Sequence, residues 1–293
     1  MSDQAAAELK PRPTKRRRLR RAGTHLLISL IAVYAVYCSA MYFGQHVLLF
    51  PGWITMHQDV PGPAPAGVET VWITTETGER VEAWFIAAPG ASAEKPAPAV
   101  IYFHGNGEVI DWRMGVADEY ISHGISTLLV EYRGYGRSGG RPSQHAIARD
   151  SIAFHDWLCA RPDVDARRLV YHGRSLGGGI AIELARTHEP RALIVESTFT
   201  SIVSMAWQRG IPGFLVASPF RNDLVLPELT CAILIFHGTQ DTLIPVEHGR
   251  RLHALAPGSE YVEMDGGHNT FPADYKAYLD AIVAFLRRAG VIG

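Results

Sequence analysis

The chain turns from a short apolar strand into a helix within the stretch Val170-Tyr-His-Gly-Arg-Ser175-Leu-Gly-Gly-Gly-Ile180. Its centre has the pattern Gly-x-Ser-x-Gly, which alone occurs by chance in many proteins. The flanking strand and helix are more informative, because a sharp turn between them exposes the serine hydroxyl above a sheet edge. Gly173 and Gly177 have no Cβ, so the two arms of the turn can approach closely. The stretch therefore predicts a nucleophilic Ser175, provided that a base and an acid follow.

A base and an acid do follow, in the order that this turn requires: Ser, Asp, His. Asp241 lies 66 residues after Ser175, just past an apolar strand-like run, and His268 lies 27 residues further on, after a second such run. Parallel strands end at one edge of an open sheet, so the three side chains are expected to meet there. Taken singly, Asp241 could be a helix N-cap and His268 a loop histidine. Together they predict a catalytic triad.

A fourth element of the predicted site lies upstream. The apolar strand expected at Ala99–Phe103 ends in His104-Gly-Asn-Gly107. Acyl transfer needs a second N–H donor opposite the one that follows the nucleophile. We expect the backbone N–H groups of Asn106 and Leu176 to form this oxyanion hole; the alternative is an ordinary glycine-rich strand exit. His104 is expected to brace the loop rather than to act as a second base.

With these stretches the sequence resembles the α/β-hydrolase family, in the serine-hydrolase branch whose members carry an N-terminal membrane anchor. The matching stretches are Tyr102-Phe-His-Gly-Asn-Gly107, Glu131-Tyr-Arg-Gly-Tyr-Gly-Arg-Ser-Gly-Gly140, Gly173-Arg-Ser-Leu-Gly-Gly178, Glu196-Ser-Thr-Phe199, His237-Gly-Thr-Gln-Asp-Thr-Leu-Ile-Pro245 and Gly266-Gly-His-Asn269. The resemblance implies an eight-stranded, mostly parallel sheet, a Ser/Asp/His triad and no cofactor. Relatives often have Asp at Glu131, a position that we interpret as part of a turn.

The hydrophobic pattern agrees with this α/β architecture. Strand-like stretches are predicted at 69–75, 81–87, 99–103, 126–132, 169–172, 192–196, 232–237 and 260–264. Helix-like stretches are predicted at 111–123, 144–159, 176–187, 246–256 and 273–288. A β-only opening followed by βα alternation is typical of a mixed sheet with helices on both faces. Residues 67–293 are therefore expected to form one catalytic domain.

The N-terminal region has a different character. Eight basic residues lie within 1–25, and no Lys, Arg, Asp or Glu occurs from Ala22 to Gln58. We expect a basic cytoplasmic tail at 1–25, a transmembrane anchor at 26–45 and a linker at 46–66. Because no basic residue lies between Arg21 and Arg80, the positive-inside rule predicts a single-pass membrane protein with a cytoplasmic N-terminus. The catalytic domain would then be extracytoplasmic, in a periplasm or lumen.

Three alternatives compete with an uncleaved anchor. A signal peptide would have an unusually long apolar region and lacks a clean Ala-x-Ala site. The paired arginines could direct twin-arginine export, although their surroundings match that signal poorly. A lipoprotein-type Cys38 is disfavoured by the bulky Tyr37 before it.

Charge and cysteine content narrow the possible partners. The 28 basic and 29 acidic residues give a net charge of −1, but beyond residue 25 there are 20 basic and 27 acidic residues. Such an acidic domain is not expected to bind nucleic acid, whereas the basic tail can bind anionic membrane lipid. The three cysteines, Cys38, Cys159 and Cys231, form no disulfide framework and have no zinc-ligand spacing, so no metal site is expected; the absence of another cofactor is what the resemblance implies.

The expected function is hydrolysis of carboxylic ester or thioester bonds. The resemblance implies this, because relatives in this branch act on lysophospholipids, acyl-protein thioesters or simple esters. A short cap is predicted at about 198–230, and its apolar residues could line an acyl pocket or simply pack on the sheet. A peptidase of the same fold would use the same triad, but it usually carries a large gating domain that this chain lacks. A catalytically silent membrane scaffold would not need a complete triad.

Overall fold

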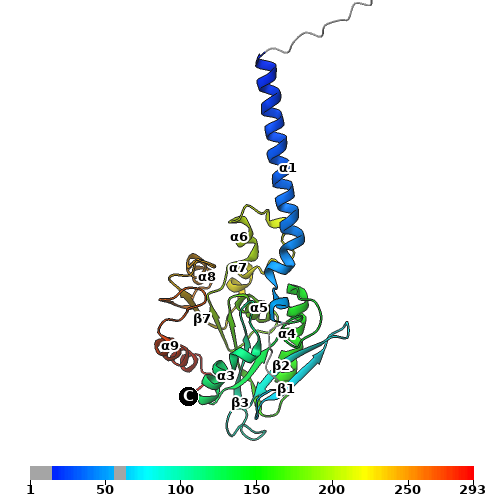
Figure 1. Ribbon diagram of the computed structural model, residues 1–293. Helices are drawn as coiled ribbons and strands as arrows, with labels where there is room; N and C mark the ends of the chain where they lie inside the picture. The colour runs from blue at the N-terminus through cyan, green and yellow to red at the C-terminus, as the bar shows by residue number, and fades with distance from the viewer. Residues whose placement is uncertain (1–14, 56–63) are drawn as a thin grey trace, which may run out of the picture. The chain divides into compact units, whose positions relative to one another are not determined.

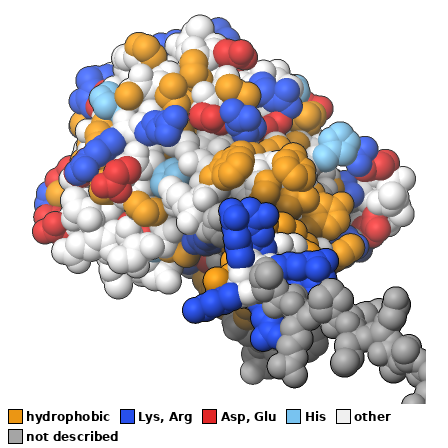
Figure 2. All heavy atoms as spheres, turned by 90° about the horizontal axis from the view of Figure 1, so that it is seen from above, with side chains coloured by type: hydrophobic (Ala, Val, Ile, Leu, Met, Phe, Trp, Pro, Cys, Tyr) orange, Lys and Arg blue, Asp and Glu red, His pale blue; other side chains and the backbone are white. Residues whose placement is uncertain are grey.

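The computed structural model describes residues 15–55 and 64–293, which divide into two units between Gly44 and Gln45. Helix α1 (Lys15–Leu49) makes up the described part of the first unit and continues into the second. It is 35 residues long, and it is long and apolar enough to cross a membrane. The helix begins within the basic segment, earlier than the predicted span at 26–45. Figure 2 shows these basic side chains gathered at the start of α1.

Within the described residues, the second unit is built around an eight-stranded sheet with the order β1-β2-β4-β3-β5-β6-β7-β8. The strands are β1 (Glu69–Thr74), β2 (Arg80–Ile86), β3 (Ala97–Phe103), β4 (Ser126–Val130), β5 (Val164–Arg174), β6 (Ala192–Glu196), β7 (Ala232–Gly238) and β8 (Glu260–Met264). β2 pairs antiparallel with β1 and β4, and the other neighbours pair parallel. The parallel part therefore presents the carboxyl ends of its strands along one edge.

Helices cover both faces of this sheet (Figure 1). The longer ones are α3 (Met114–Ser122), α4 (Gln144–Cys159), α5 (Leu176–Ala185), α8 (Glu247–Leu255) and α9 (Tyr275–Arg288). Short helical elements are α2 (Gly52–Thr55), η1 (Ile110–Arg113), α6 (Ile202–Trp207), η2 (Gly213–Leu215), α7 (Asn222–Val225) and η3 (Leu226–Glu228). The core on one face includes residues of α4, α5 and α8, and the cores on the other include residues of α3 and α9.

The central strands are apolar at successive positions because both of their faces are covered. Every residue of β3, β4 and β6 is buried. Such continuous apolar runs are typical of parallel strands between two helix layers. The edge strand β8 alternates less clearly and is only half-buried throughout.

The predicted fold class, an α/β-hydrolase fold with an eight-stranded, mostly parallel sheet, is confirmed. Each predicted strand has a counterpart, and the largest difference is β5, which starts five residues before the predicted 169. The early residues of β5 are polar and partly exposed, so their hydrophobic pattern does not reveal a strand. The predicted cap region, 198–230, contains four short helical elements, which are α6, η2, α7 and η3 in chain order.

Part of the segment predicted as a linker, 46–66, belongs to the globular unit. Phe50 is 3% exposed and lies in the core that also contains Val71, Tyr132 and Tyr135. The Oγ of Thr55 also accepts a hydrogen bond from the N–H of Gly136, at 3.3 Å. Residues 56–63 lie outside the described residues. The catalytic domain was predicted to begin at residue 67. Because Phe50 and Thr55 contact the globular unit, we propose that the domain begins near Gln45.

We expect Phe50→Ala to lower the stability of the globular unit, because it removes a buried aromatic ring and leaves a cavity. The expected loss is about 3 to 5 kcal/mol of unfolding free energy. Denaturant unfolding of the membrane-reconstituted protein would measure it. Ile54→Ala is the matched control, since Ile54 is 40% exposed and should cost far less. Equal, small effects of both substitutions would show that residues 45–55 are only a tether.

Candidate active site

Ser175 occupies the turn between β5 and α5 and has a strained backbone. β5 ends at Arg174 and α5 begins at Leu176, so a single residue makes the turn. Its φ is 54° and its ψ is −116°, a conformation that non-glycine residues rarely adopt. The N–H of Ser175 donates to the carbonyl of Glu196 at 2.8 Å, and its own carbonyl accepts from Thr198 Oγ1 at 2.8 Å. These bonds to the end of β6 hold the strained turn in place.

The two glycines of the motif are required by close backbone contacts. A Cβ at Gly173 would lie 2.2 Å from the carbonyl oxygen of Gly177, inside the turn. A Cβ at Gly177 would lie 2.0 Å from the carbonyl oxygen of Phe103 and 2.6 Å from that of His104. All three distances are far below van der Waals contact, so any side chain would push the helix away. The start of α5 therefore packs directly against the end of β3.

The three predicted triad residues meet at the carboxyl edge of the sheet. Ser175 Oγ lies 3.0 Å from His268 Nε2, and His268 Nδ1 lies 2.7 Å from Asp241 Oδ2. Asp241 follows β7, and His268 follows β8, as the sequence predicted. With Nδ1–H donating to the carboxylate, Nε2 is left to accept the serine hydroxyl proton.

The surroundings of Asp241 keep it ionised. Its side chain is buried, which would raise its pKa, but the hydrogen bond with His268 and the N–H of Ile244 outweigh burial and lower the pKa. Asp241 Oδ1 accepts from the N–H groups of Leu243 at 2.9 Å and Ile244 at 2.8 Å. The carboxylate thus has one oxygen fixed by backbone donors and the other directed at the imidazole.

The two predicted oxyanion-hole residues lie on neighbouring elements. Leu176 is the first residue of α5, directly after Ser175. Asn106 lies in the loop after β3, and its side-chain Oδ1 accepts a hydrogen bond from the Tyr135 hydroxyl at 2.8 Å. Because Gly177 touches the end of β3, this loop adjoins the start of α5. The role of the two N–H groups as an oxyanion hole stays a prediction.

His104 braces the loop, and Glu131 holds it there. His104 Nε2 lies 2.7 Å from Glu131 Oε1, and Nδ1 lies 2.9 Å from the carbonyl of Gly105. Both ring nitrogens face acceptors, so only the protonated imidazole satisfies both. Burial lowers the pKa of His104, but the Glu131 carboxylate outweighs it and the net shift is upward. Glu131 also accepts from the N–H groups of Ile110 and Tyr132.

Glu131 lies after β4, outside any strand or helix, as predicted, and its side chain also holds the loop after β3. Its side chain is 1% exposed and makes contacts to three segments of the chain. No sequence motif indicates these contacts, because they depend on packing between residues far apart in the chain.

A second ion pair, which the sequence analysis missed, links the three loops of the site. Glu108 accepts from the N–H of Gly105 at 2.8 Å and pairs with the guanidinium of Arg174. Arg174 also donates to the backbone carbonyl of His268. Thus Glu108 and Arg174 connect the loop after β3, the serine turn and the histidine loop. The arginine at the second position of Gly-x-Ser-x-Gly is the signal that could have drawn attention to it.

Two other histidines near the strand ends have hydrogen-bond partners outside the triad, although His237 Nε2 also lies 3.7 Å from Asp241 Oδ2. His172 pairs with the Glu196 carboxylate, and His237 Nε2 lies 2.8 Å from the carbonyl of Ile244. Burial lowers the pKa of His237, so it is neutral near physiological pH. Among the described residues, ligand atoms of His155, Asp156 and His188 lie within 4.8 Å of one another and could hold a metal ion. None of these three contacts the triad in a described hydrogen bond or ion pair.

The His104–Glu131 pair should make stability depend on pH. The pKa of His104 is raised in the folded protein above its ordinary value of 6.5, so its contribution is full below that value and is lost as pH rises through the folded pKa. The stability difference between wild type and Glu131→Gln should therefore shrink as pH rises above 6.5. Denaturant unfolding across this range measures it. A difference that grows with pH would contradict the assignment.

Replacing Glu108 should impair turnover more than substrate binding. Glu108→Gln removes the charge that pairs with Arg174, and the loops it connects should lose their alignment. We expect kcat to fall roughly 10- to 100-fold with little change in KM. Glu260→Gln, which removes an exposed partner of Arg288, is the matched control. A selective rise in KM, or no effect, would show that Glu108 does not position the site.

Comparisons with known proteins agree with this architecture. The family model described as "Serine aminopeptidase, S33" matches residues 94–225. The Arabidopsis thaliana alpha/beta hydrolase domain-containing protein WAV2 is 32% identical over 245 residues, covering 76% of this chain and 79% of its own. The Mycobacterium tuberculosis protein Rv2307c is 33% identical over 235 residues, covering 78% of this chain and 82% of its own.

Solved structures show the same fold. The esterase Pf2001 of Pyrococcus furiosus has a TM-score of 0.61 and 22% identity, covering 78% of this chain and 94% of its own. DcsB, solved with a substrate analogue, has a TM-score of 0.63 and 20% identity, covering 77% of this chain and 100% of its own. The sheet order, the serine turn and the two relatives of more than 30% identity lead to one conclusion: the chain belongs to the α/β-hydrolase family.

Proposed function

We propose that this protein is a serine hydrolase that cleaves carboxylic ester or thioester bonds through an acyl-enzyme. The observation that carries the proposal is the chain of hydrogen bonds from Ser175 through His268 to Asp241. Ser175 Oγ lies on a strained turn, 3.0 Å from His268 Nε2, and His268 Nδ1 lies 2.7 Å from Asp241 Oδ2. A hydroxyl beside an oriented imidazole is the arrangement that activates serine as a nucleophile.

In the proposed mechanism, Ser175 Oγ forms a bond to the acyl carbonyl carbon as its proton moves to His268 Nε2. Asp241 stabilises the imidazolium through Nδ1–H. Collapse of the tetrahedral intermediate breaks the bond to the leaving oxygen or sulfur, which takes the proton from His268. A water molecule, deprotonated by the same histidine, then attacks the acyl-enzyme, and Ser175 recovers its proton as the carboxylic acid departs.

The oxyanion is proposed to be held by the N–H groups of Leu176 and Asn106. Leu176 begins α5, so its N–H is free of the intrahelical ladder and points out of the helix start. Glu108 and His104 support the opposite donor by fixing the loop that contains Asn106. Donors fixed before the reaction stabilise the developing charge without reorganisation.

We further propose that substrates are acyl or lipid-derived compounds and that the protein works at a membrane. Gln45, at the end of the apolar run, joins the cap: its Nε2 donates to the carbonyl of Leu215 at 3.0 Å, and its Oε1 accepts from the N–H of Ala217 at 2.7 Å. The cap exposes Trp207 by 60% and Phe214 by 86%. In a protein with a predicted membrane anchor, exposed apolar side chains in the cap favour access by substrates from the bilayer.

The proposed topology is a single span with the N-terminus in the cytoplasm and the catalytic domain on the far side. It is supported by the length and exposure of α1 and by the basic residues at its start. The catalytic domain would then bind its ester or thioester substrate at the periplasmic or lumenal surface of the membrane.

A peptidase activity is the second candidate, because the matching family model is described as a serine aminopeptidase. The same triad would serve, but a peptide amide has a poorer leaving group than an ester. Assays on aminoacyl amides beside the matching esters distinguish the two. A catalytically silent scaffold would show neither activity.

The test is hydrolysis of p-nitrophenyl esters from acetate to palmitate by the membrane-embedded protein. We expect activity that rises with chain length and falls by several orders of magnitude in Ser175→Ala, because the nucleophile is lost. Ser204→Ala, which changes a serine in the cap, is the matched control and should remain active.

Each other outcome has a definite meaning. Turnover confined to short chains would contradict the lipid-derived substrate but not the serine mechanism. Ser175-dependent turnover of amides in place of esters would favour the peptidase. Equal rates for wild type and Ser175→Ala would remove the serine mechanism.

A further inference from the structure

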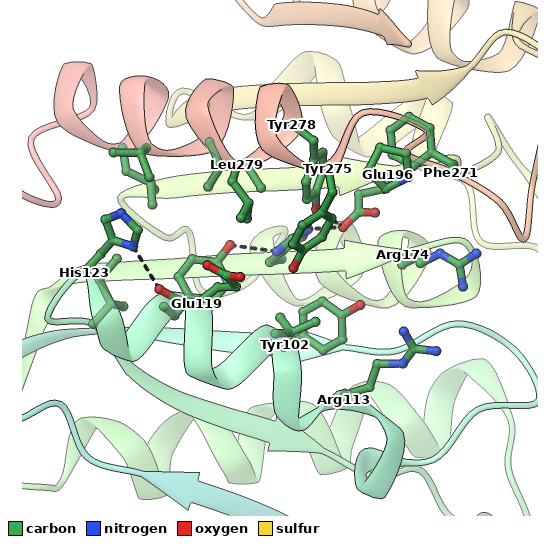
Figure 3. A pocket seen from close by; sticks show the side chains of 18 of the residues that line it. Tyr102, Arg113, Glu119, His123, Arg174, Glu196, Phe271, Tyr275, Tyr278 and Leu279 are labelled. Atoms are coloured by element: carbon green, nitrogen blue, oxygen red, sulfur yellow. Dashed lines mark hydrogen bonds and ion pairs between the residues drawn. The ribbon is translucent and has the colours of Figure 1, made fainter. Parts of the chain in front are cut away.

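A cavity of about 400 Å³ lies between α3 and α9, on the face of the sheet opposite α5 (Figure 3). Its volume falls within the range of roughly 300 to 1,000 Å³ that is typical of small-molecule sites. Ser175, Asp241 and His268 do not line it, but Arg174 and Asn269, their neighbours in sequence, do. The cavity is therefore separate from the triad and begins beside it.

Both helices contribute aliphatic side chains to the walls, beside the polar side chains of Glu119, Tyr120, Tyr275 and Tyr278. α3 contributes Val116, and α9 contributes Leu279, Ile282, Val283 and Leu286. The cavity extends from Arg113, before α3, to His123, after it. Ten residues of helix correspond to about 15 Å, so the space suits a single extended alkyl chain rather than a compact polar molecule.

The end of the cavity nearest the triad is cationic. Figure 3 shows Arg113 and Arg174 at this end, where the only carboxylate that pairs with both among the described residues is that of Glu108. Arg113 Nη2 lies 3.0 Å from Glu108 Oε1. In the described part of the chain, Arg113 Nε is buried yet has no hydrogen-bond partner. One of these two guanidinium groups, that of Arg113, therefore keeps an unused donor; the Glu196 carboxylate, which also lines the cavity, pairs with His172.

The polar groups on the floor of the cavity are already paired with one another. Tyr278 donates to Glu196 at 2.6 Å, His172 pairs with the same carboxylate, and the Tyr120 hydroxyl lies 2.7 Å from His172 Nδ1. Glu119 lies toward the opposite end from Arg113 (Figure 3). An anion is thus favoured at the Arg113 end alone.

We propose that this cavity binds a single-chain carboxylate, with its head on Arg113 and its alkyl chain between α3 and α9. A carboxylate adds one negative charge beside Glu108, whereas a phosphate monoester adds about −1.5 to −2 near pH 7 and would be repelled more strongly. Guanidinium groups bind carboxylates through paired hydrogen bonds, and the unused Nε–H of Arg113 supplies one of them. The proposal does not depend on the catalytic role of Ser175.

The experiment uses full-length Ser175→Ala protein in lipid nanodiscs and a dodecanoate analogue with a photoreactive diazirine in its chain. After irradiation, peptide mapping should locate the label on α3 and α9. Excess dodecanoate should abolish this labelling, and dodecanol, which has no charge, should compete at least about tenfold less well because it lacks the charge-assisted bond. Because turnover is not read, failure of the proposed hydrolase activity would leave this result unaffected.

Two variants and their controls locate the head and the chain. Leu279→Trp fills the cavity and should abolish labelling, while Arg287→Trp, on the exposed side of α9, should not. Arg113→Gln should weaken competition by dodecanoate about tenfold, while Arg167→Gln, whose side chain is 91% exposed, should not.

Three results would overturn the proposal: label confined to α1 or the cap, equal competition by dodecanol and dodecanoate, or unchanged labelling of Leu279→Trp. Stronger competition by dodecyl phosphate than by dodecanoate would overturn the carboxylate assignment.

Discussion

The site depends on one constraint: Ser175 must make the whole turn from β5 to α5 by itself. Its positive φ is tolerated because Glu196 and Thr198 bind its backbone and because Gly173 and Gly177 leave room for the two arms. The same close contact presses the start of α5 against the end of β3. The serine hydroxyl and the two proposed oxyanion donors are thereby gathered at one corner of the sheet.

Buried ion pairs keep the loops around this corner in register. The pair of His104 and Glu131 fixes the loop after β3. Glu108 and Arg174 connect this loop to the serine turn and to the loop that contains His268. A charged pair that is buried is costly unless every partner is satisfied. Here each carboxylate also accepts backbone N–H groups, so the pairs define loop positions. Reacting groups that must stay aligned benefit from such rigid support.

Much of this could be predicted from the sequence, for physical reasons. The hydrophobic patterns of the strands and helices reflect burial on both faces of the sheet. Ser175, Asp241 and His268 were expected to meet because each follows a strand and the strands end at one edge. The importance of Glu131 and the link between Glu108 and Arg174 could not be predicted, because they arise from contacts between loops distant in the chain. The cavity between α3 and α9 was equally hidden, since its lining residues look like ordinary helix positions. The packing of Phe50 into the core was hidden by its place next to an apolar span.

The most direct test is to find which residue is the activated nucleophile. Membrane-embedded protein would be treated with a fluorophosphonate that reacts with activated serines, digested, and mapped by mass spectrometry. The account predicts one adduct, on Ser175, formed by wild type and lost in His268→Ala because the hydroxyl is no longer activated. An adduct on another serine, or labelling of Ser175 that persists unchanged without His268, would contradict it.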